Sequence, residues 1–248
     1  MTNDIRIPTM LLSEAICRRN IAAMVAHAQG HDIRLRPHFK THQSRLIGRW
    51  FRELGIDSIT VSSVAMANYF ADDGWTDITI AFPINLREID DLEALASRVK
   101  LGLLVESPRV IVPLQERLGE VDIWLKIDTG YGRTGIAWDN TALLEECARA
   151  VAATATLRLR GILTHAGDTY HAAGPDEIRE RFDRSRTRMH SSLRTLQPCA
   201  ADLLCSVGDT PGCSLGRDFA GIDEIRPGNF VFHDVMQYRL GVCRTEDI

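Results

Sequence analysis

The sequence predicts an α/β fold of the (β/α)8 TIM-barrel class. Eight short runs of β-branched and aliphatic residues recur along the chain, and helical periodicity fills most of the gaps between them. This alternation is typical of a parallel sheet, and 248 residues suit one eight-stranded barrel. No low-complexity or linker-like stretch divides the chain.

Seven of the eight predicted strands carry polar residues at or near their carboxyl ends. They span residues 33–38, 58–63, 78–83, 101–106, 121–128, 159–165, 203–208 and 224–230. In a barrel these carboxyl ends gather at one rim, where active sites of this fold lie. The polar ends include His38, Ser62, Glu106, Lys126 and His165. One polar strand end means little, but seven at one rim predict a site there.

The predicted helices carry apolar residues at the spacing i, i+3, i+4 and i+7. This spacing occurs from Ile21 to Ala28 and again from Leu144 to Val151. A longer apolar stripe runs from Ile178 to Leu196 and is opened by Pro175, which suits the first turn of a helix.

The composition is that of a globular protein and argues against several classes of partner. Hydrophobic residues make up 45% of the chain and charged residues 25%, and the formal net charge is −4. This balance argues against a nucleic-acid coat or a polybasic membrane patch. No apolar run approaches the ~20 residues of a membrane span, so no nucleic acid and no membrane is expected as a partner. Six cysteines without a CxxC pair favour reduced thiols and a cytoplasmic location.

Lysine is scarce in this chain. Of the 29 basic residues only Lys40, Lys100 and Lys126 are lysines, and the others are arginines. Arginine keeps its proton and cannot serve as an amine nucleophile, whereas lysine can. Lys40 follows the first predicted strand, so a Schiff-base role at the rim competes with that of an ordinary surface lysine.

Two glycine turns follow the last two predicted strands. The first contains Ser206, Gly208 and Thr210, and the second contains Gly228 and Asn229. Glycines let backbone N–H groups approach a phosphate closely, and the loops after strands 7 and 8 hold one in many barrels, although both segments could simply be turns. A lysine opposite a phosphate cradle is what pyridoxal phosphate requires.

The fifth and sixth predicted strands end in further chemical groups. Strand alternation predicts that Lys126 points into the barrel, with Asp128 as a candidate partner in an ion pair. The glycines around Arg133 would let its guanidinium turn back over the site and bind an anionic oxygen. His165 and Tyr170 are either site residues or core residues.

The combined segments resemble fold-type III pyridoxal-phosphate enzymes. They are most similar to the D-threonine aldolase and D-serine dehydratase branch, with alanine racemase and the small pyridoxal-phosphate homeostasis proteins as more distant relatives. The resemblance rests on RPHFKTH (36–42), KIDTGYGRTG (126–135), THAGDTY (164–170), SVGDTP (206–211) and EIRPGNFVFHD (224–234). It implies a barrel of the alanine racemase N-terminal type.

The resemblance also implies a role for each matched residue. Lys40 would hold pyridoxal phosphate as a Schiff base, and Arg133 would contact the phenolic oxygen of the cofactor. His165 would lie beside the ring, and either Tyr170 or Arg226 would contact the pyridine nitrogen. The residues implied for the phosphate are Ser206, Gly208, Thr210, Gly228 and Asn229. Lys126 falls where some alanine racemases carry a carbamylated lysine.

Members of this branch carry a second, β-rich domain with a His-x-Cys or His-x-Asp pair that binds a divalent metal. Manganese, magnesium or zinc is therefore expected for the family, but this chain contains no such pair, so no metal ligand is predicted in it. We expect residues 1–235 to form the cofactor-binding barrel. Residues 236–248 are expected to begin a truncated C-terminal β-domain.

The implied function is a pyridoxal-phosphate-dependent lyase that acts on a small-molecule D-β-hydroxy amino acid, in the manner of D-threonine aldolase. The alternatives are elimination as in D-serine dehydratase, and a catalytically silent one-domain cofactor carrier. A racemase is disfavoured because no second base is apparent, and a barrel that binds phosphorylated sugars is a further alternative. A homodimer is expected by analogy with relatives.

Overall fold

In the computed structural model, which describes residues 5–9 and 11–248, a parallel sheet runs in the order β1-β9-β8-β7-β5-β4-β3-β2. The strands are β1 (Arg34–Leu35), β2 (Ile59–Val61), β3 (Asp77–Pro83), β4 (Lys100–Val105), β5 (Val121–Asp128), β6 (Ile136–Ala137), β7 (Leu157–Thr164), β8 (Leu204–Val207) and β9 (Glu224–Ile225). The sheet closes between its two ends, because the chain after β1 pairs with β2 through a bridge between His38 and Thr60. The predicted (β/α)8 class is confirmed.

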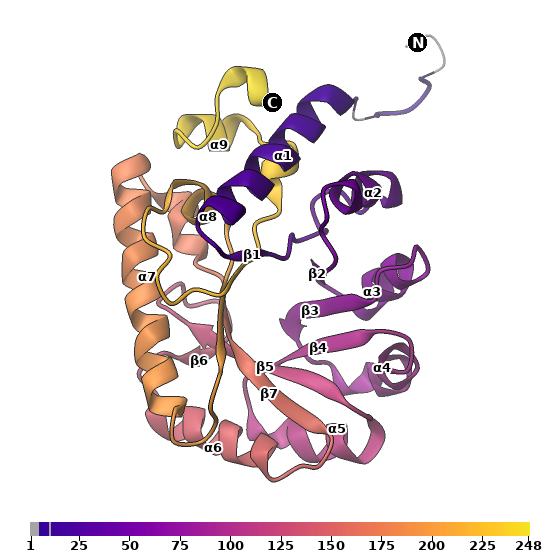
Figure 1. Cartoon of the computed structure of the whole chain (residues 1–248), viewed down its shortest axis with the longest axis vertical. Helices are drawn as coiled ribbons and strands as arrows, with labels where there is room; N and C mark the ends of the chain where they lie inside the picture. Colours follow the sequence, from indigo (N-terminus) through magenta and orange to yellow (C-terminus); the bar gives the residue numbers. More distant parts are fainter. Residues whose placement is uncertain (1–4, 10) are drawn as a thin grey trace.

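Helices cover the outside of this barrel. They are α1 (Glu14–Gly30), α2 (Arg45–Glu53), α3 (Val64–Ala71), α4 (Ile89–Ala96), α5 (Ile111–Arg117), α6 (Thr141–Ala152), α7 (Pro175–Leu196), α8 (Thr210–Leu215) and α9 (Val235–Arg239). Figure 1 shows α2, α3 and α4 stacked along one side of the sheet and α7 along the opposite side. The apolar spacings predicted for α1, α6 and α7 are the buried faces of these helices.

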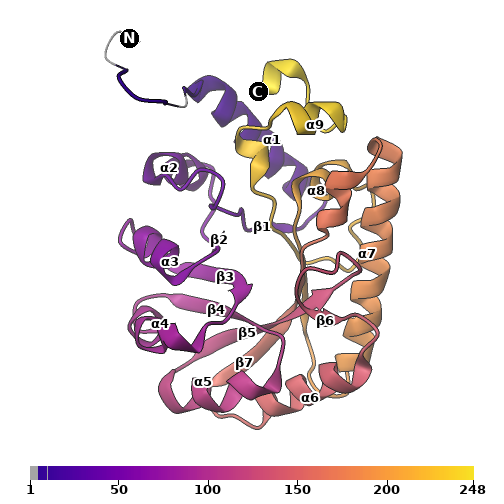
Figure 2. The same cartoon turned by 180° about the vertical axis from the view of Figure 1, so that it is seen from behind.

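Three differences from the predicted strands have local causes. The run 224–230 pairs only over Glu224–Ile225, because Pro227 has no N–H for a ladder and the chain then turns through a 3-10 helix at Asn229–Val231. The run 33–38 is likewise reduced to Arg34–Leu35 plus the bridge at His38. The short strand β6, which sequence periodicity missed, pairs with the end of β5 and is seen from behind in Figure 2.

Residues 236–248 pack on the first helix. The backbone carbonyl of Glu246 accepts a hydrogen bond from Arg19, and that of Asp247 accepts one from Asn20 at 2.7 Å. This segment contains most of α9 and the 3-10 helix η5 (Thr245–Asp247). The domain boundary at residue 235 stays a prediction.

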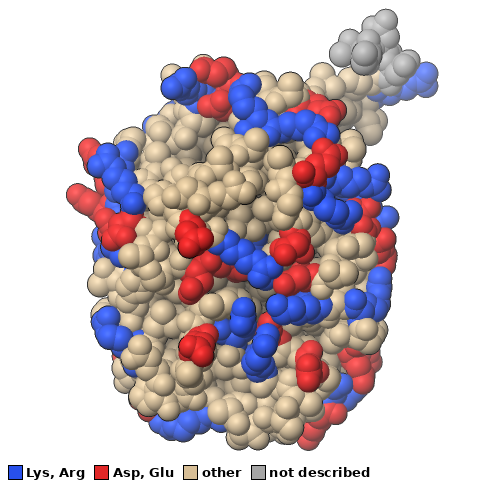
Figure 3. Space-filling model, viewed as in Figure 1, with Lys and Arg blue, Asp and Glu red and all other residues tan. Residues whose placement is uncertain are grey.

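The amino-terminal end of the barrel is closed by ion pairs. Asp77 at the start of β3 binds Arg36 at 2.6 Å and Lys100 at 3.3 Å, and Asp122 at the start of β5 binds Arg158 at 2.6 Å. Figure 3 shows positive and negative side chains mixed near the centre of one face of the molecule. None of the helices among the described residues has the length and apolar character needed to cross a bilayer.

Gly161 allows β7 and β8 to approach each other. It pairs with Leu204, and a Cβ at position 161 would collide with the Leu204 backbone. We expect Gly161→Ala to lower the free energy of unfolding by about 3 kcal/mol, because the strands must separate to admit the methyl group. Urea denaturation measures this loss. Gly119→Ala is the matched control, since a Cβ there meets nothing within 4 Å; equal losses in the two variants would contradict the account.

Candidate active site

A cavity of about 450 Å³ opens at the carboxyl ends of the strands. Eight of the ten predicted site residues line it: Lys40, Arg133, His165, Tyr170, Gly208, Arg226, Gly228 and Asn229. The other two, Ser206 and Thr210, do not. The barrel thus brings together residues that are up to 189 positions apart in the sequence.

Lys40 lies at the mouth of the cavity, just after the segment that closes the barrel. Its backbone N–H points to Nδ1 of His38 at 3.4 Å. Desolvation lowers the pKa of the Lys40 amine, and the positive charges of Arg133 and Arg226 lower it further. A lysine with a lowered pKa has more of the neutral amine that reacts with a carbonyl group.

Lys126 is buried and lines the cavity, as strand alternation predicted. Burial lowers its pKa to about 7, and Arg226 and Arg133 add to this effect. The predicted ion pair with Asp128 is wrong. The Asp128 carboxylate instead accepts the backbone N–H groups of Gly130, at 2.9 Å, and Gly132, at 3.1 Å, because the tight turn after β5 leaves these donors without other partners.

His165 is held as one neutral tautomer. Its Nδ1 lies 2.6 Å from the carbonyl oxygen of Gly208, and since a carbonyl only accepts, Nδ1 carries the hydrogen. Burial lowers the pKa of His165 to about 3, and the charges of Arg133, Lys126 and Lys40 contribute to this shift. Nε2 therefore has a free lone pair at neutral pH.

Tyr170 and Thr210 connect the loops around the cavity. The Tyr170 hydroxyl accepts the backbone N–H of Thr210 at 3.1 Å, and the Thr210 hydroxyl accepts the backbone N–H of Asn229 at 3.0 Å. Burial raises the pKa of Tyr170 to about 12, so it stays a phenol with an O–H to donate. Thr210 thus joins the turns after β8 and β9 without lining the cavity.

Arg226 is fixed by a chain of buried polar groups. Its Nε donates to the Ser206 hydroxyl at 2.7 Å, and that hydroxyl donates to Glu224 at 2.7 Å. Glu224 also accepts from Arg36 at 2.6 Å. Burial lowers the pKa of Arg226 to about 10, so its guanidinium keeps its charge at neutral pH. The Ser206 hydroxyl thus bonds to Arg226 and Glu224 inside the barrel, and its place at a phosphate stays a prediction.

Gly228 lets the turn after β9 approach the chain next to Lys40. A Cβ at position 228 would lie 2.7 Å from the carbonyl oxygen of His38. Glycine is therefore needed here for the close approach of two backbones, besides any ligand that the turn holds.

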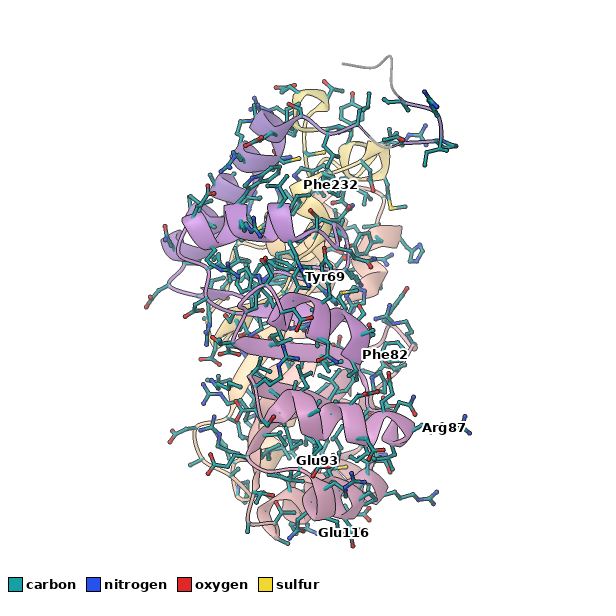
Figure 4. The ribbon with its side chains drawn as sticks, turned by 90° about the vertical axis from the view of Figure 1, so that its right-hand side faces the viewer. Tyr69, Phe82, Arg87, Glu93, Glu116 and Phe232 are labelled. Atoms are coloured by element: carbon teal, nitrogen blue, oxygen red, sulfur yellow. The ribbon has the colours of Figure 1, made fainter. Side chains whose placement is uncertain are left out.

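Several residues that line the cavity were not among the predicted site residues. They are His38, Thr41, Ser62, Ala81, Phe82, Pro83, Thr134, Leu163 and Asp209. The polar strand ends in the sequence pointed to His38 and Ser62. Nothing in the local pattern pointed to Phe82, which is 61% exposed at the rim and lies on the same side of the molecule as Tyr69 and Phe232 (Figure 4).

Among the described residues, no group of three or more His, Cys, Asp or Glu side chains comes together to hold a metal ion. The six cysteines are all free thiols.

Glu224 balances two buried guanidinium groups, so its removal tests the chain of polar groups. We expect Glu224→Gln to lower the free energy of unfolding by about 3 to 5 kcal/mol, because Arg36 and Arg226 then share one less negative charge in the barrel interior. Glu53→Gln is the control, since Glu53 pairs with Arg18 on the surface and its loss should cost less than about 1 kcal/mol. Denaturant titration compares the two, and a similar small effect for both would refute the role of Glu224.

Comparison with known proteins identifies relatives of this chain. Over 239 residues it is 34% identical to D-threo-3-hydroxyaspartate dehydratase of Delftia sp. strain HT23, and the match covers 93% of this chain and 62% of that protein. The solved structure of the same dehydratase matches with a TM-score of 0.93, over 99% of this chain and 66% of that one. The chain thus spans about 62% of the length of this relative.

Two further relatives have related names. D-serine dehydratase of Dictyostelium discoideum is 27% identical over 99% of this chain and 67% of its own length. The crystal structure of D-threonine aldolase from Filomicrobium marinum matches with a TM-score of 0.87 and 25% identity, over 95% of this chain and 65% of that one. The predicted resemblance to the D-threonine aldolase and D-serine dehydratase branch is confirmed.

A family model described as alanine racemase, N-terminal domain, matches residues 13–235, which cover the whole barrel from α1 to the turn after β9. With the barrel, the lysine after β1 and the glycine turns after β8 and β9 all in place, this chain belongs to the alanine racemase N-terminal domain family of fold-type III pyridoxal-phosphate proteins.

Proposed function

We propose that this chain binds pyridoxal phosphate and forms the cofactor-binding part of a lyase that acts on D-β-hydroxy amino acids. One observation supports this most directly: Lys40 lines the same cavity as the glycine turns that contain Gly208 and Gly228. A reactive amine and a phosphate cradle in one cavity are the two attachments that the cofactor needs.

The residues of the cavity fit this cofactor. A Cβ at position 228 would lie 2.7 Å from the His38 carbonyl oxygen, and one at position 208 would lie 3.1 Å from Arg226, so the backbone of both turns lies close to its neighbours. The positive charges of Arg133 and Arg226 suit a phenolate oxygen and a carboxylate. Lys40 would hold the cofactor, Arg133 would face its phenolic oxygen, and Gly208, Gly228 and Asn229 would hold its phosphate.

When bound, pyridoxal phosphate supplies an electron-withdrawing ring that weakens the bonds at the substrate α-carbon. The chain supplies the groups that orient and exchange protons. His165 offers a lone pair at Nε2, and Lys126, with a pKa of about 7, can take or release a proton near neutral pH. Tyr170 offers an O–H and Arg226 an N–H, so both stay candidates for the pyridine nitrogen.

Both relatives with dehydratase names and a relative with an aldolase name match this chain, so two reactions fit the family. Aldolase cleavage breaks the Cα–Cβ bond and gives glycine and an aldehyde. Elimination removes the β-hydroxyl and gives a keto acid and ammonia. The 34% identity to a D-threo-3-hydroxyaspartate dehydratase favours elimination as the second candidate beside the predicted aldolase activity.

A mutant of that dehydratase has been solved in a metal-free form, which supports metal use in the family. We propose that the lyase reaction uses a divalent ion (manganese, magnesium or zinc). The described residues do not fit such an ion, so we assign no ligand and no step to it. We further propose that the protein lies in the cytoplasm, acts on a small D-amino acid and forms a homodimer.

The lysine is tested by chemical trapping. We expect borohydride reduction of the protein with pyridoxal phosphate to fix the cofactor on Lys40, because its amine has a lowered pKa and lies in the cavity. Peptide mass spectrometry locates the adduct. Lys40→Ala should abolish it and Lys100→Ala should keep it, since Lys100 lies at the opposite end of the barrel. An adduct on Lys126 instead of Lys40 would show that Lys126 is the lysine that attaches the cofactor.

The reaction is tested by its products. The protein, loaded with pyridoxal phosphate, is incubated with D-threonine, D-serine and D-threo-3-hydroxyaspartate, each with and without manganese or zinc. Glycine plus an aldehyde indicates the aldolase, and ammonia plus a keto acid indicates the dehydratase. If the protein binds the cofactor firmly but forms neither product under any metal condition, the result supports the alternative that this chain is a cofactor carrier.

A further inference from the structure

A second, smaller cavity adjoins the candidate active site, and the proposed function gives it no role. It has a volume of about 180 Å³ and lies where β3 and β4 meet α3 and α4. Its inner lining is aliphatic and consists of Val64, Ile80, Leu92 and Leu103, each at most 5% exposed. We call this cavity the side pocket.

The side pocket and the larger cavity have a common wall. Ser62, Phe82 and Pro83 line both of them, so the two cavities meet at these residues. Phe82 is the largest of the three side chains and is 61% exposed. A ligand in the larger cavity therefore has an apolar, aliphatic space beside it, with one aromatic ring at the junction.

An irregularity in β3 places Phe82 at this junction. From Ile80 to Pro83 the pairing of β3 advances by only one residue along β4, so Ala81 and Phe82 have no partner on that strand. Pro83 has no N–H for the ladder, which accounts for the break. Bulges of this kind re-aim side chains beside active sites, and this one presents the Phe82 ring to both cavities.

Three polar residues that line the side pocket bond to nearby atoms. The Ser63 hydroxyl accepts the backbone N–H of Met66 at 3.1 Å. The Asn85 side chain accepts the backbone N–H of Arg87 at 3.1 Å and donates to Glu88 at 3.2 Å. Glu88 is the only charged side chain among the described residues of the lining, and it would repel a carboxylate. The side pocket thus favours an uncharged, apolar group.

The order of the strands puts the side pocket on the substrate side of the proposed cofactor. On the ring of pyridoxal phosphate, the carbon that reacts with amines lies between the phenolic oxygen and the phosphate arm. The proposed function places the phosphate at the turns after β8 and β9 and the phenolic oxygen near Arg133, after β5. The closed sheet runs from β9 through β1, β2, β3 and β4 to β5. A substrate joined to that carbon therefore extends over the rim between Lys40 and Arg133, where the side pocket opens.

We propose that the side pocket receives the substituent on the β-carbon of the substrate and that Phe82 helps to select it. The substrate class is a D-β-hydroxy amino acid that carries an aryl or branched alkyl group. An apolar cavity of about 150 Å³ holds benzene. The side pocket, at about 180 Å³, is large enough for a phenyl ring, and Phe82 can stack against that ring. This inference rests on the proposed function, since it takes the reacting carbon of the cofactor as its starting point.

The test compares D-phenylalanine with D-alanine on the protein loaded with pyridoxal phosphate. Neither amino acid has a β-hydroxyl group, so neither lyase reaction proceeds, and the two differ only by the phenyl group. Equilibrium dialysis with the labelled amino acids gives their dissociation constants. We expect D-phenylalanine to bind about tenfold to a hundredfold more tightly than D-alanine, the range expected for burial of one aromatic side chain.

Three variants locate the effect. Ile84→Phe fills the side pocket and leaves the larger cavity untouched, because Ile84 lines only the side pocket. It should bring the ratio of the two dissociation constants close to one and leave the value for D-alanine unchanged. Phe82→Ala removes an exposed ring, should lower the ratio about threefold or more, and serves if Ile84→Phe does not fold. Val112→Ala is the control, since Val112 is 60% exposed on α5 and lines neither cavity.

A second readout needs no cofactor. Benzene binding to the protein without pyridoxal phosphate is measured by saturation-transfer NMR. We expect benzene to bind the unchanged protein and Val112→Ala equally, and to bind Ile84→Phe about tenfold more weakly or not at all, because the added ring occupies the same space.

The outcomes separate this inference from the proposed function. If D-phenylalanine binds no more tightly than D-alanine, or if Ile84→Phe leaves benzene binding unchanged, the role of the side pocket is overturned while cofactor binding stands. If the unchanged protein does not bind pyridoxal phosphate, the proposed function is overturned and this inference with it.

Discussion

A chain of mostly buried polar groups inside the barrel supports the rest of the structure. It runs from Asp77 through Arg36, Glu224 and Ser206 to Arg226, and each link is a hydrogen bond of 2.6 or 2.7 Å. Two guanidinium groups and two carboxylates balance one another, so the interior carries charge without an uncompensated ion. The chain connects the ion pairs at the amino-terminal end of the barrel with the cavity at the other end.

This arrangement decides what the cavity can bind. Arg226 is held in place at the cavity, because its Nε donates to the Ser206 hydroxyl and its Nη2 donates to the Thr164 carbonyl. Burial, helped by the charge of Arg133, keeps the pKa of His165 low and its ring neutral. Burial and the charges of Arg133 and Arg226 also lower the pKa of Lys40. The same cations that disfavour a protonated amine favour anions, so a reactive neutral lysine and an anionic ligand are compatible in one cavity.

The relatives share this barrel and differ in the reactions that their names describe. Dehydratases and an aldolase match the chain over at least 93% of its length, and alanine racemase of Clostridium difficile 630 shares the fold at 16% identity. The barrel is thus common to proteins whose names describe several reactions. The barrel fold by itself therefore does not fix the reaction.

The sequence by itself determined the barrel, the lysine and the turns. Strand and helix periods are local properties, so the order of elements could be read directly, and the scarcity of lysine together with its place after β1 singled out Lys40. The inward direction of Lys126 followed from strand alternation in the same way.

Only the tertiary structure decided the partners of the polar groups. Ser206 bonds to Glu224, 18 residues away, and Glu224 bonds to Arg36, 188 residues away, so no local pattern could identify the partners of this hydroxyl. Asp128 precedes a turn whose N–H groups donate to its carboxylate, and Asp209 accepts hydrogen bonds from Thr169 and Gly212, which lie in separate elements. Periodicity fixes which face a residue occupies, but hydrogen bonds and charge balance depend on what the closed barrel places beside it.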